Sequence, residues 1–148
     1  MRLVAAVCLA AALAFAGDGG RADYVGGTLP GIPSGTGGRI HATDDVQFRF
    51  EAGRNSVRIP WGRVNLLEYG LQVNRRYAMA VLVSPMFLLS KSRRHFVTVG
   101  YTDDNGKQQA MVVQVDKNDV RAVLVALEAR SGQRVQFQDQ EARKAGKG

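Results

Sequence analysis

Few residues in this chain have the types and spacing that catalysis or metal binding requires. The two histidines, His41 and His95, lie far apart in the sequence, and both belong to stretches with the pattern of β-strands. We therefore interpret them as ordinary strand residues and not as a metal-binding pair. No serine lies in a Gly-x-Ser-x-Gly turn, so no serine nucleophile is indicated. We expect no catalytic residue, no metal, no cofactor and no enzymatic activity.

The remaining reactive or aromatic residues have structural explanations. The carboxylate pairs at 44–45 and 103–104 lie in predicted turns, where Asp is favoured because it hydrogen-bonds to the nearby backbone. Trp61 is most simply a core or rim aromatic. A phosphate-binding loop needs a Lys-Ser/Thr pair after its glycines, but Arg39-Ile40 follows the glycine-rich stretch 24–38. Nucleotide binding is therefore not expected.

One stretch combines apolar character with positive charge. Residues 77–89 (YAMAVLVSPMFLL) contain no charged side chain, and basic residues flank the stretch on both sides. A single helix of this length reaches about 20 Å, short of the roughly 30 Å hydrocarbon core of a bilayer. If the chain folds back at Ser84-Pro85, the basic flanks meet at the base of an apolar hairpin. The candidate contact residues are Met86, Phe87, Leu88 and the flanking Arg75, Arg76, Lys91, Arg93 and Arg94.

Two interpretations of this stretch are open. In the first, the apolar residues dip into an anionic membrane surface or contact a membrane or periplasmic protein, and each nearby Lys or Arg adds about 1 kcal/mol. In the second, residues 77–89 are part of the core and the basic residues are solvated. A nucleic-acid partner is not expected, because the basic residues are not interleaved with aromatic side chains.

The first residues have the layout of a secretory signal peptide. A positive start at Arg2 is followed by an apolar, Ala-rich stretch, and Ala14-Phe15-Ala16 has the small residues that a signal peptidase requires. We expect cleavage after Ala16, with cleavage after Ala22 as the alternative. Cys8, the single cysteine, lies in the removed segment, so the mature chain has no thiol or disulfide. A bacterial periplasmic or extracellular location fits best.

The composition is that of one globular domain. The chain has 148 residues, 45% of them hydrophobic, and 20 Lys and Arg against 13 Asp and Glu give a net charge of +7. These values are too apolar for a disordered chain. No continuous apolar run reaches the roughly 18 residues that suggest a transmembrane helix.

Short alternating runs predict a mainly β protein. In the run 46–50 we expect Val46, Phe48 and Phe50 to share one buried face. In the run 95–101 we expect the same of Val97, Val99 and Tyr101. The runs 95–101 and 108–115 flank the turn sequence DDNG at 103–106, where Asn105 and Gly106 predict a positive-φ hairpin turn. The predicted strands are 39–42, 46–50, 56–59, 64–69, 95–101, 108–115 and a short one within 133–137.

One amphipathic helix is expected near the C-terminus. Asp116 is the predicted cap, and Gly132 is the predicted stop. The spacing of the apolar residues between them is that of one buried stripe, formed by Val120, Val123, Leu124 and Leu127. We expect the glycine-rich residues 17–38 to form an irregular arm, with an extended entry to the fold as the alternative for 24–38, and the polar residues 139–148 to fray.

The order of these elements resembles the pleckstrin-homology-like (PH-like) and GRAM-like superfold. The runs IPWGRVNLLEYG, RRHFVTVGYTDDNGKQQAMVVQV and LEARSG also resemble a group of uncharacterised bacterial secreted proteins. The resemblance implies a small antiparallel PH-like barrel or sandwich of about six to seven strands with one C-terminal amphipathic helix. The organisation would be a signal peptide at 1–16, the arm at 17–38, a single domain at 39–138 with an apolar insertion at 75–94, and the tail.

The superfold implies a function by analogy only. We expect an exported, non-enzymatic binding module of unknown ligand, which contacts a membrane surface or membrane protein through residues 77–89 and their basic flanks. The alternative is a soluble structural or protein-interaction domain in which residues 77–89 are core.

Overall fold

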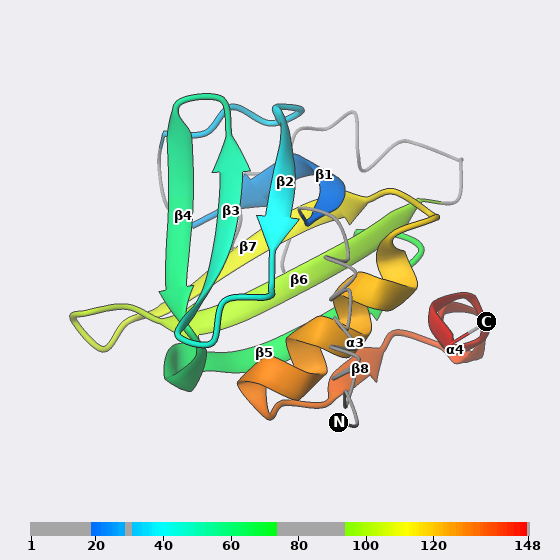
Figure 1. Ribbon diagram of the computed structural model, residues 1–148. Coiled ribbons are helices and arrows are strands. Elements are labelled where there is room, and N and C mark those ends of the chain that lie inside the picture. The colour runs from blue at the N-terminus through cyan, green and yellow to red at the C-terminus, as the bar shows by residue number, and fades with distance from the viewer. Residues whose placement is uncertain (1–18, 29–30, 74–93, 148) are drawn as a thin grey trace, which may run out of the picture.

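The protein is built around one mixed β-sheet. A computed structural model describes residues 19–28, 31–73 and 94–147, and in them eight strands pair in the order β4-β3-β2-β1-β7-β6-β5-β8 (Figure 1). All neighbours are antiparallel except β5 and β8, which are parallel. The strands are β1 (Gly20–Gly27), β2 (Gly37–His41), β3 (Gln47–Ala52), β4 (Asn55–Pro60), β5 (Val64–Gly70), β6 (His95–Thr102), β7 (Gln108–Val115) and β8 (Val135–Phe137).

The mainly β prediction is confirmed, but three of its details are wrong. The sheet has eight strands instead of six or seven, and one pair is parallel. The sheet does not close into a barrel, because the end strands β4 and β8 each have one neighbour. β8 is parallel to β5 because a helix precedes it and returns the chain to the same end of the sheet.

The sheet bends so that its two halves enclose the core. In Figure 1, β2, β3 and β4 cross the direction of β5, β6 and β7, and β1 belongs to both halves. The register between β1 and β7 shifts between Tyr24 and Gly26, and such a bulge increases the local bend of a strand. Inward-facing side chains from both halves form the main core, among them Phe48, Phe50, Leu67 and Val97.

The predicted faces of the strands are confirmed with one exception. Phe48 and Phe50 are fully buried, as are Val97 and its neighbours on the same face of β6. Val46 is 73% exposed, because β3 begins one residue later and Val46 belongs to the preceding turn. A second, smaller cluster lies apart from the main core and consists of Val25, Val73, Phe96, Ala110 and Val112.

The helix α3 (Val120–Ser131) covers the core side of the sheet at one end. All four residues of its predicted stripe are buried, and the helix contacts β1, β5 and the short 3-10 helix η1 (Trp61–Arg63). Gly132 ends it in the left-handed conformation with φ of 72°, as predicted. The predicted cap is wrong: the helix begins three residues later, and the Asp116 carboxylate accepts from the Asn118 N–H instead.

The expectation of an irregular arm is wrong for residues 20–27, which form β1. Its backbone is tied to the segment before α3, because the Arg21 N–H donates to Asp119 Oδ2 at 2.9 Å and the Arg21 carbonyl accepts from the Asp116 N–H. The glycines serve close packing here. A Cβ on Gly20 would lie 2.5 Å from Val123, and one on Gly38 in β2 would lie 2.2 Å from the Glu51 carbonyl oxygen.

The hairpin between β6 and β7 is confirmed, but its turn differs from the prediction. Gly106 has φ of 76°, whereas no non-glycine residue in the described part of the chain has positive φ. Asp103 explains the difference, because its Oδ1 accepts from the N–H groups of Asn105 and Lys107 at 2.9 Å each. These bonds hold Asn105 in an ordinary conformation and leave Gly106 alone to supply the left-handed residue.

The expectation of a frayed tail is wrong for most of that segment. Residues Gln140–Lys147 form the helix α4, in which Ala142 and Gly146 are buried. α4 packs against β5 and β8, where a Cβ on Gly146 would lie 2.8 Å from the Phe137 ring. Two small residues at helical spacing thus let the helix approach the sheet.

Candidate functional site

Most residues of the predicted contact surface lie outside the described part of the chain. These are Arg75, Arg76, Met86, Phe87, Leu88, Lys91 and Arg93. Arg94 is described and half-buried, and its Nη1 donates to Gln114 Oε1 at 3.2 Å. Arg94 therefore has a contact within the fold, while the contact of residues 77–89 with a membrane stays a prediction.

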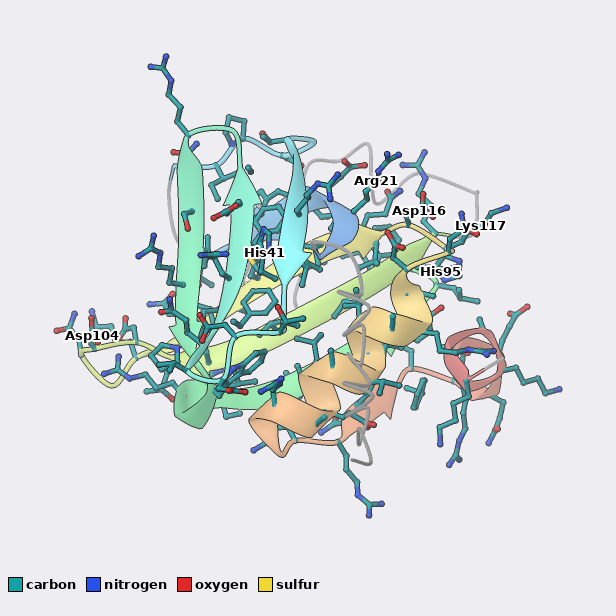
Figure 2. All side chains as sticks on the ribbon, in the orientation of Figure 1. Arg21, His41, His95, Asp104, Asp116 and Lys117 are labelled. Carbon is teal, nitrogen blue, oxygen red and sulfur yellow. The ribbon has the colours of Figure 1, made fainter. Side chains whose placement is uncertain are left out.

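The two histidines lie apart and have different partners. His41 ends β2 and its Nε2 lies 3.1 Å from Glu51 Oε2, whereas His95 begins β6 beside Asp116 and Lys117 (Figure 2). Across residues 19–28, 31–73 and 94–147, no three His, Cys, Asp or Glu side chains come together as a metal site.

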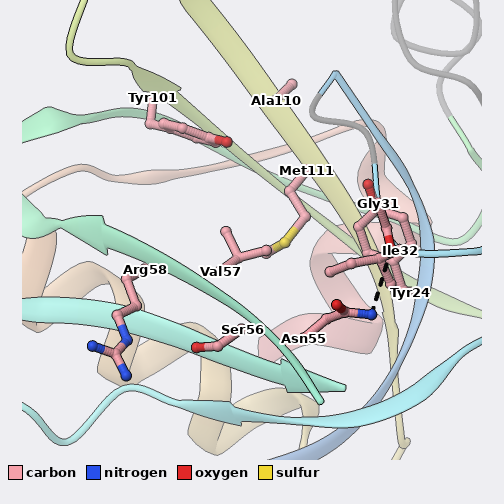
Figure 3. Close-up of a pocket in the computed structure, with 10 residues that line it drawn as sticks. All are labelled: Tyr24, Gly31, Ile32, Asn55, Ser56, Val57, Arg58, Tyr101, Ala110 and Met111. Atoms are coloured by element: carbon pink, nitrogen blue, oxygen red, sulfur yellow. Dashed lines mark hydrogen bonds between the residues drawn. The ribbon is translucent and has the colours of Figure 1, made fainter. Parts of the chain in front are cut away.

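A pocket of about 340 Å³ lies between the two halves of the sheet, away from α3 (Figure 3). Four consecutive residues of β4, Asn55–Arg58, form one wall, and the other wall comes from β1, β6, β7 and the loop after β1. Its apolar surface comes from Ile32, Val57, Ala110 and Met111. A volume of this size is at the lower end of the range for small-molecule sites.

Two tyrosines give this pocket a polar character. Tyr24 from β1 and Tyr101 from β6 line it, with side chains only 4% and 6% exposed. Neither hydroxyl has a hydrogen-bond partner among the described residues. Tyrosine hydroxyls in the interior usually find a hydrogen-bond partner, so both groups are free to pair with a molecule that enters the pocket, either water or a ligand.

The electrostatics of the pocket keep both phenols neutral. Burial raises the pKa of Tyr24 and raises that of Tyr101 to about 12. The neighbouring Tyr24 and Asp103 add to the increase at Tyr101. At neutral pH both hydroxyls therefore carry their protons and can donate as well as accept one hydrogen bond.

The rim of the pocket provides further polar groups. The Asn55 amide donates to the Gly31 carbonyl at 3.4 Å and bridges β4 to the opposite loop. Arg58 is the one charged residue of the lining, and its side chain extends away from Val57 and Met111 (Figure 3). We call the lining residues Tyr24, Gly31, Ile32, Asn55–Arg58, Tyr101, Ala110 and Met111 the tyrosine pocket.

A third buried tyrosine, Tyr69 in β5, has a hydrogen-bond partner for its hydroxyl within the fold. It is fully buried, and its hydroxyl lies 2.5 Å from His95 Nδ1. The rings of Tyr69 and His95 stack at 6.0 Å. Burial raises the pKa of Tyr69 to about 12 and lowers that of His95, so a protonated phenol and a neutral imidazole share this hydrogen bond.

A second pocket, of about 250 Å³, lies beside α3. Small side chains line it, including Ala42, Ala122 and Ala126. Asp119, the one acidic residue of this lining, already accepts from the Arg21 backbone. The other polar side chain of the described lining is Thr43, which is exposed to solvent.

Sequence reasoning did not find the tyrosine pocket, because its residues come from five separate segments. One weak signal was present at Tyr101, which ends the inward-facing row of β6 after Val97 and Val99. Tyr at a core position usually finds a hydrogen-bond partner, so a tyrosine in such a row indicates a polar neighbour or a pocket.

Comparisons with known proteins add no homologue. No protein-family model matches this chain, and no curated protein matches it either. In the described residues, no helix is long and apolar enough to cross a membrane. The site must therefore be interpreted from its own geometry.

Proposed function

We propose that this protein is an exported, non-enzymatic binding module and that its ligand enters the tyrosine pocket. The observation that carries this proposal is the pair of buried tyrosines, Tyr24 and Tyr101, that line the pocket and whose hydroxyls have no hydrogen-bond partner in the described chain. An apolar pocket with a few convergent polar groups is the usual form of a small-ligand site. The ligand therefore has an apolar body and a polar group that reaches the two hydroxyls.

The chemistry of the lining favours binding over catalysis. A phenol with a pKa of about 12, as at Tyr101, stays protonated at neutral pH and is a poor general base. The lining residues that the structure describes include no His, Asp, Glu, Lys or Cys that could activate a nucleophile. The residues of this pocket can orient a ligand by hydrogen bonds but have no group suited to transfer its protons.

Other parts of the proposal rest on the sequence. Seven strands followed by the helix α3 are compatible with a PH-like domain, and export rests on the signal-peptide pattern of residues 1–16. The start of β1 at Gly20 favours cleavage after Ala16, because cleavage after Ala22 would remove three strand residues. Membrane contact through residues 77–89 is a separate proposal, tested by co-sedimentation with anionic vesicles at low and high salt.

The test of the tyrosine pocket uses a small probe with the expected chemistry. We suggest 2-heptanone, which has an apolar chain and one carbonyl acceptor, and the ¹³C resonance of the Met111 methyl group as the reporter. Addition of the ketone is expected to shift this resonance with saturation, and Tyr24→Phe/Tyr101→Phe is expected to weaken binding. A Met111 resonance that does not move up to the solubility limit of the ketone contradicts the proposal.

A further inference from the structure

The position of the tyrosine pocket along β4 bears on the kind of ligand. Among the described strands, β4 is an end strand of the sheet and pairs with β3 alone. Every second residue of such a strand directs its N–H and C=O groups away from the sheet, where they can pair with another extended chain. The four β4 residues of the lining are consecutive, so the pocket follows this open edge.

The two faces of β4 differ in chemistry. Val57 and Ile59 face the core side, and Val57 is also part of the pocket wall. Ser56 and Arg58 lie on the opposite face, since successive strand residues alternate. A chain that pairs with β4 would place every second side chain next to the pocket and the others next to Arg58.

Charge on the Arg58 side is unbalanced. Arg58 lies directly opposite Arg49 in the register of β3 and β4, and like charges in this position destabilise a sheet. Arg49 has Glu51 as an ion-pair partner at 3.1 Å, but neither Arg58 nor Arg54 has an ion pair with any described residue. Folding alone gives no reason for this arrangement, and an anionic partner would neutralise it.

We propose that the ligand is an extended acidic peptide that adds to the free edge of β4. Its backbone pairs with β4, its carboxylates lie beside Arg58, and one apolar side chain enters the tyrosine pocket, where Tyr24 and Tyr101 donate to its backbone carbonyl groups. Main-chain pairing supplies affinity in this mode of recognition, and the pocket supplies specificity. This inference rests on the proposed function, because it assigns the ligand of the same pocket.

The test compares blocked synthetic peptides about as long as β4. The first alternates Glu and Val, the second alternates Lys and Val, and the third is the Glu/Val peptide with its valine nitrogens methylated. We expect the first peptide to bind and to shift the amide resonances of 56–59 and the methyl resonance of Met111. We expect the Lys/Val peptide to bind about fivefold more weakly, because each exposed ion pair contributes up to about 1 kcal/mol. The methylated peptide should not bind.

Charge variants of the protein sharpen this comparison. Arg58→Glu should reverse the preference, so that the Lys/Val peptide binds more tightly than the Glu/Val peptide. Arg121→Glu, which makes the same charge change on the exposed side of α3, should leave the original preference in place. If Arg58→Glu fails to fold, Arg58→Gln serves instead and should remove the preference for the acidic peptide.

Several results would overturn the inference. Equal binding of the acidic and basic peptides contradicts the role of Arg58, and binding of the methylated peptide contradicts pairing with β4. If no peptide binds while 2-heptanone still shifts Met111 and depends on Tyr101, the pocket is a small-molecule site and only the peptide inference is wrong. If neither peptide nor ketone binds, the proposed function itself is wrong.

Discussion

The bent sheet has two open regions, one beside β1 and β5 and one beside β4, and they differ in what fills them. Beside β1 and β5, α3 inserts an apolar stripe with Leu127 fully buried, and the buried phenol in that half of the sheet, Tyr69, has His95 as its partner. Beside β4, none of the helices in residues 19–28, 31–73 and 94–147 lines the gap, and Tyr24 and Tyr101 line a pocket without a hydrogen-bond partner in the described chain.

This difference separates a structural region from a binding region. A gap filled by the protein's own apolar side chains contributes to stability in proportion to the surface that it buries. A gap lined by hydroxyls without a partner in the protein leaves those hydroxyls free to form a hydrogen bond with another molecule, which contributes about 0.5–1.5 kcal/mol each. The region beside α3 is therefore suited to hold the fold together, and the region beside β4 is suited to bind.

The largest predicted effect concerns β1, which runs from the α3 region to the tyrosine pocket. A chain that begins at Asp23 loses three residue pairs with β2 and the hydrogen bonds between Arg21 and the segment before α3. We expect a loss of about 3–5 kcal/mol, a large part of the 5–15 kcal/mol of a typical domain. Denaturant unfolding measures it.

A chain that begins at Gly17 is the matched control and should fold normally, since β1 is then complete. These two chains are also the products of cleavage after Ala22 and after Ala16. The mass of the exported protein should therefore correspond to a start at Gly17. A stable exported protein that starts at Asp23 would contradict both the importance of β1 and the expected cleavage site.

The second prediction concerns the α3 stripe. Leu127→Ala should lower the free energy of unfolding by about 2–5 kcal/mol, because a fully buried leucine leaves a cavity. Leu124→Ala, at a site 4% exposed, should cost a similar amount. Val125→Ala on the same helix is the control, because Val125 is 61% exposed and should change stability by less than about 0.5 kcal/mol. Equal losses for Leu127 and Val125 would contradict the role given to α3.

The third prediction compares two tyrosines whose pKa burial raises to about 12. Tyr69→Phe removes the hydrogen bond with His95 and should lower the free energy of unfolding by about 0.5–1.5 kcal/mol. Tyr101→Phe removes a hydroxyl that has no partner in the described chain and should leave stability unchanged or raise it slightly. Thermal or denaturant unfolding measures both changes. A larger loss of unfolding free energy for Tyr101→Phe than for Tyr69→Phe would contradict the contrast between the two regions.

The smallest effect is a pH dependence at His95. Burial lowers the pKa of His95 below its ordinary value of 6.5, and the nearby Asp116 and Lys117 act in opposite directions on it. The unfolded chain therefore takes up this proton at a higher pH than the folded chain, so stability should decrease as the pH falls through 6.5 and level off below the folded pKa. His95→Asn, which cannot titrate, should remove this step from a plot of unfolding free energy against pH. A step that persists in His95→Asn would assign it to another group.

The sequence predicts the regular parts of this fold because their signals are local. Alternation along β6 and the four-residue stripe of α3 each depend on residues a few positions apart, and both are confirmed. The sequence does not predict β1, because glycine has two opposite structural roles. Gly20 and Gly38 permit close packing against Val123 and Glu51, and sequence alone does not distinguish this use from flexibility.

The tyrosine pocket depends on long-range geometry. Tyr24 and Tyr101 become neighbours through the pairing of β1 with β7 and of β7 with β6, and no spacing in the sequence indicates this order. The charge arrangement on β4 also depends on long-range geometry. Arg58 has the sequence pattern of an ordinary exposed strand residue, and only the register of β3 and β4 shows that it lies opposite Arg49. The contact surface that the sequence did predict lies outside the described residues, except for Arg94.

The central claim is that the unpaired phenols of the tyrosine pocket receive a ligand. The most direct measurement is the Kd of 2-heptanone for Tyr101→Phe and for Tyr69→Phe, two variants that each remove one buried hydroxyl. We predict that Tyr101→Phe raises the Kd about fivefold, corresponding to the loss of one hydrogen bond of about 1 kcal/mol, and that Tyr69→Phe leaves it unchanged. Equal Kd values for Tyr101→Phe and the unmodified protein would contradict the claim.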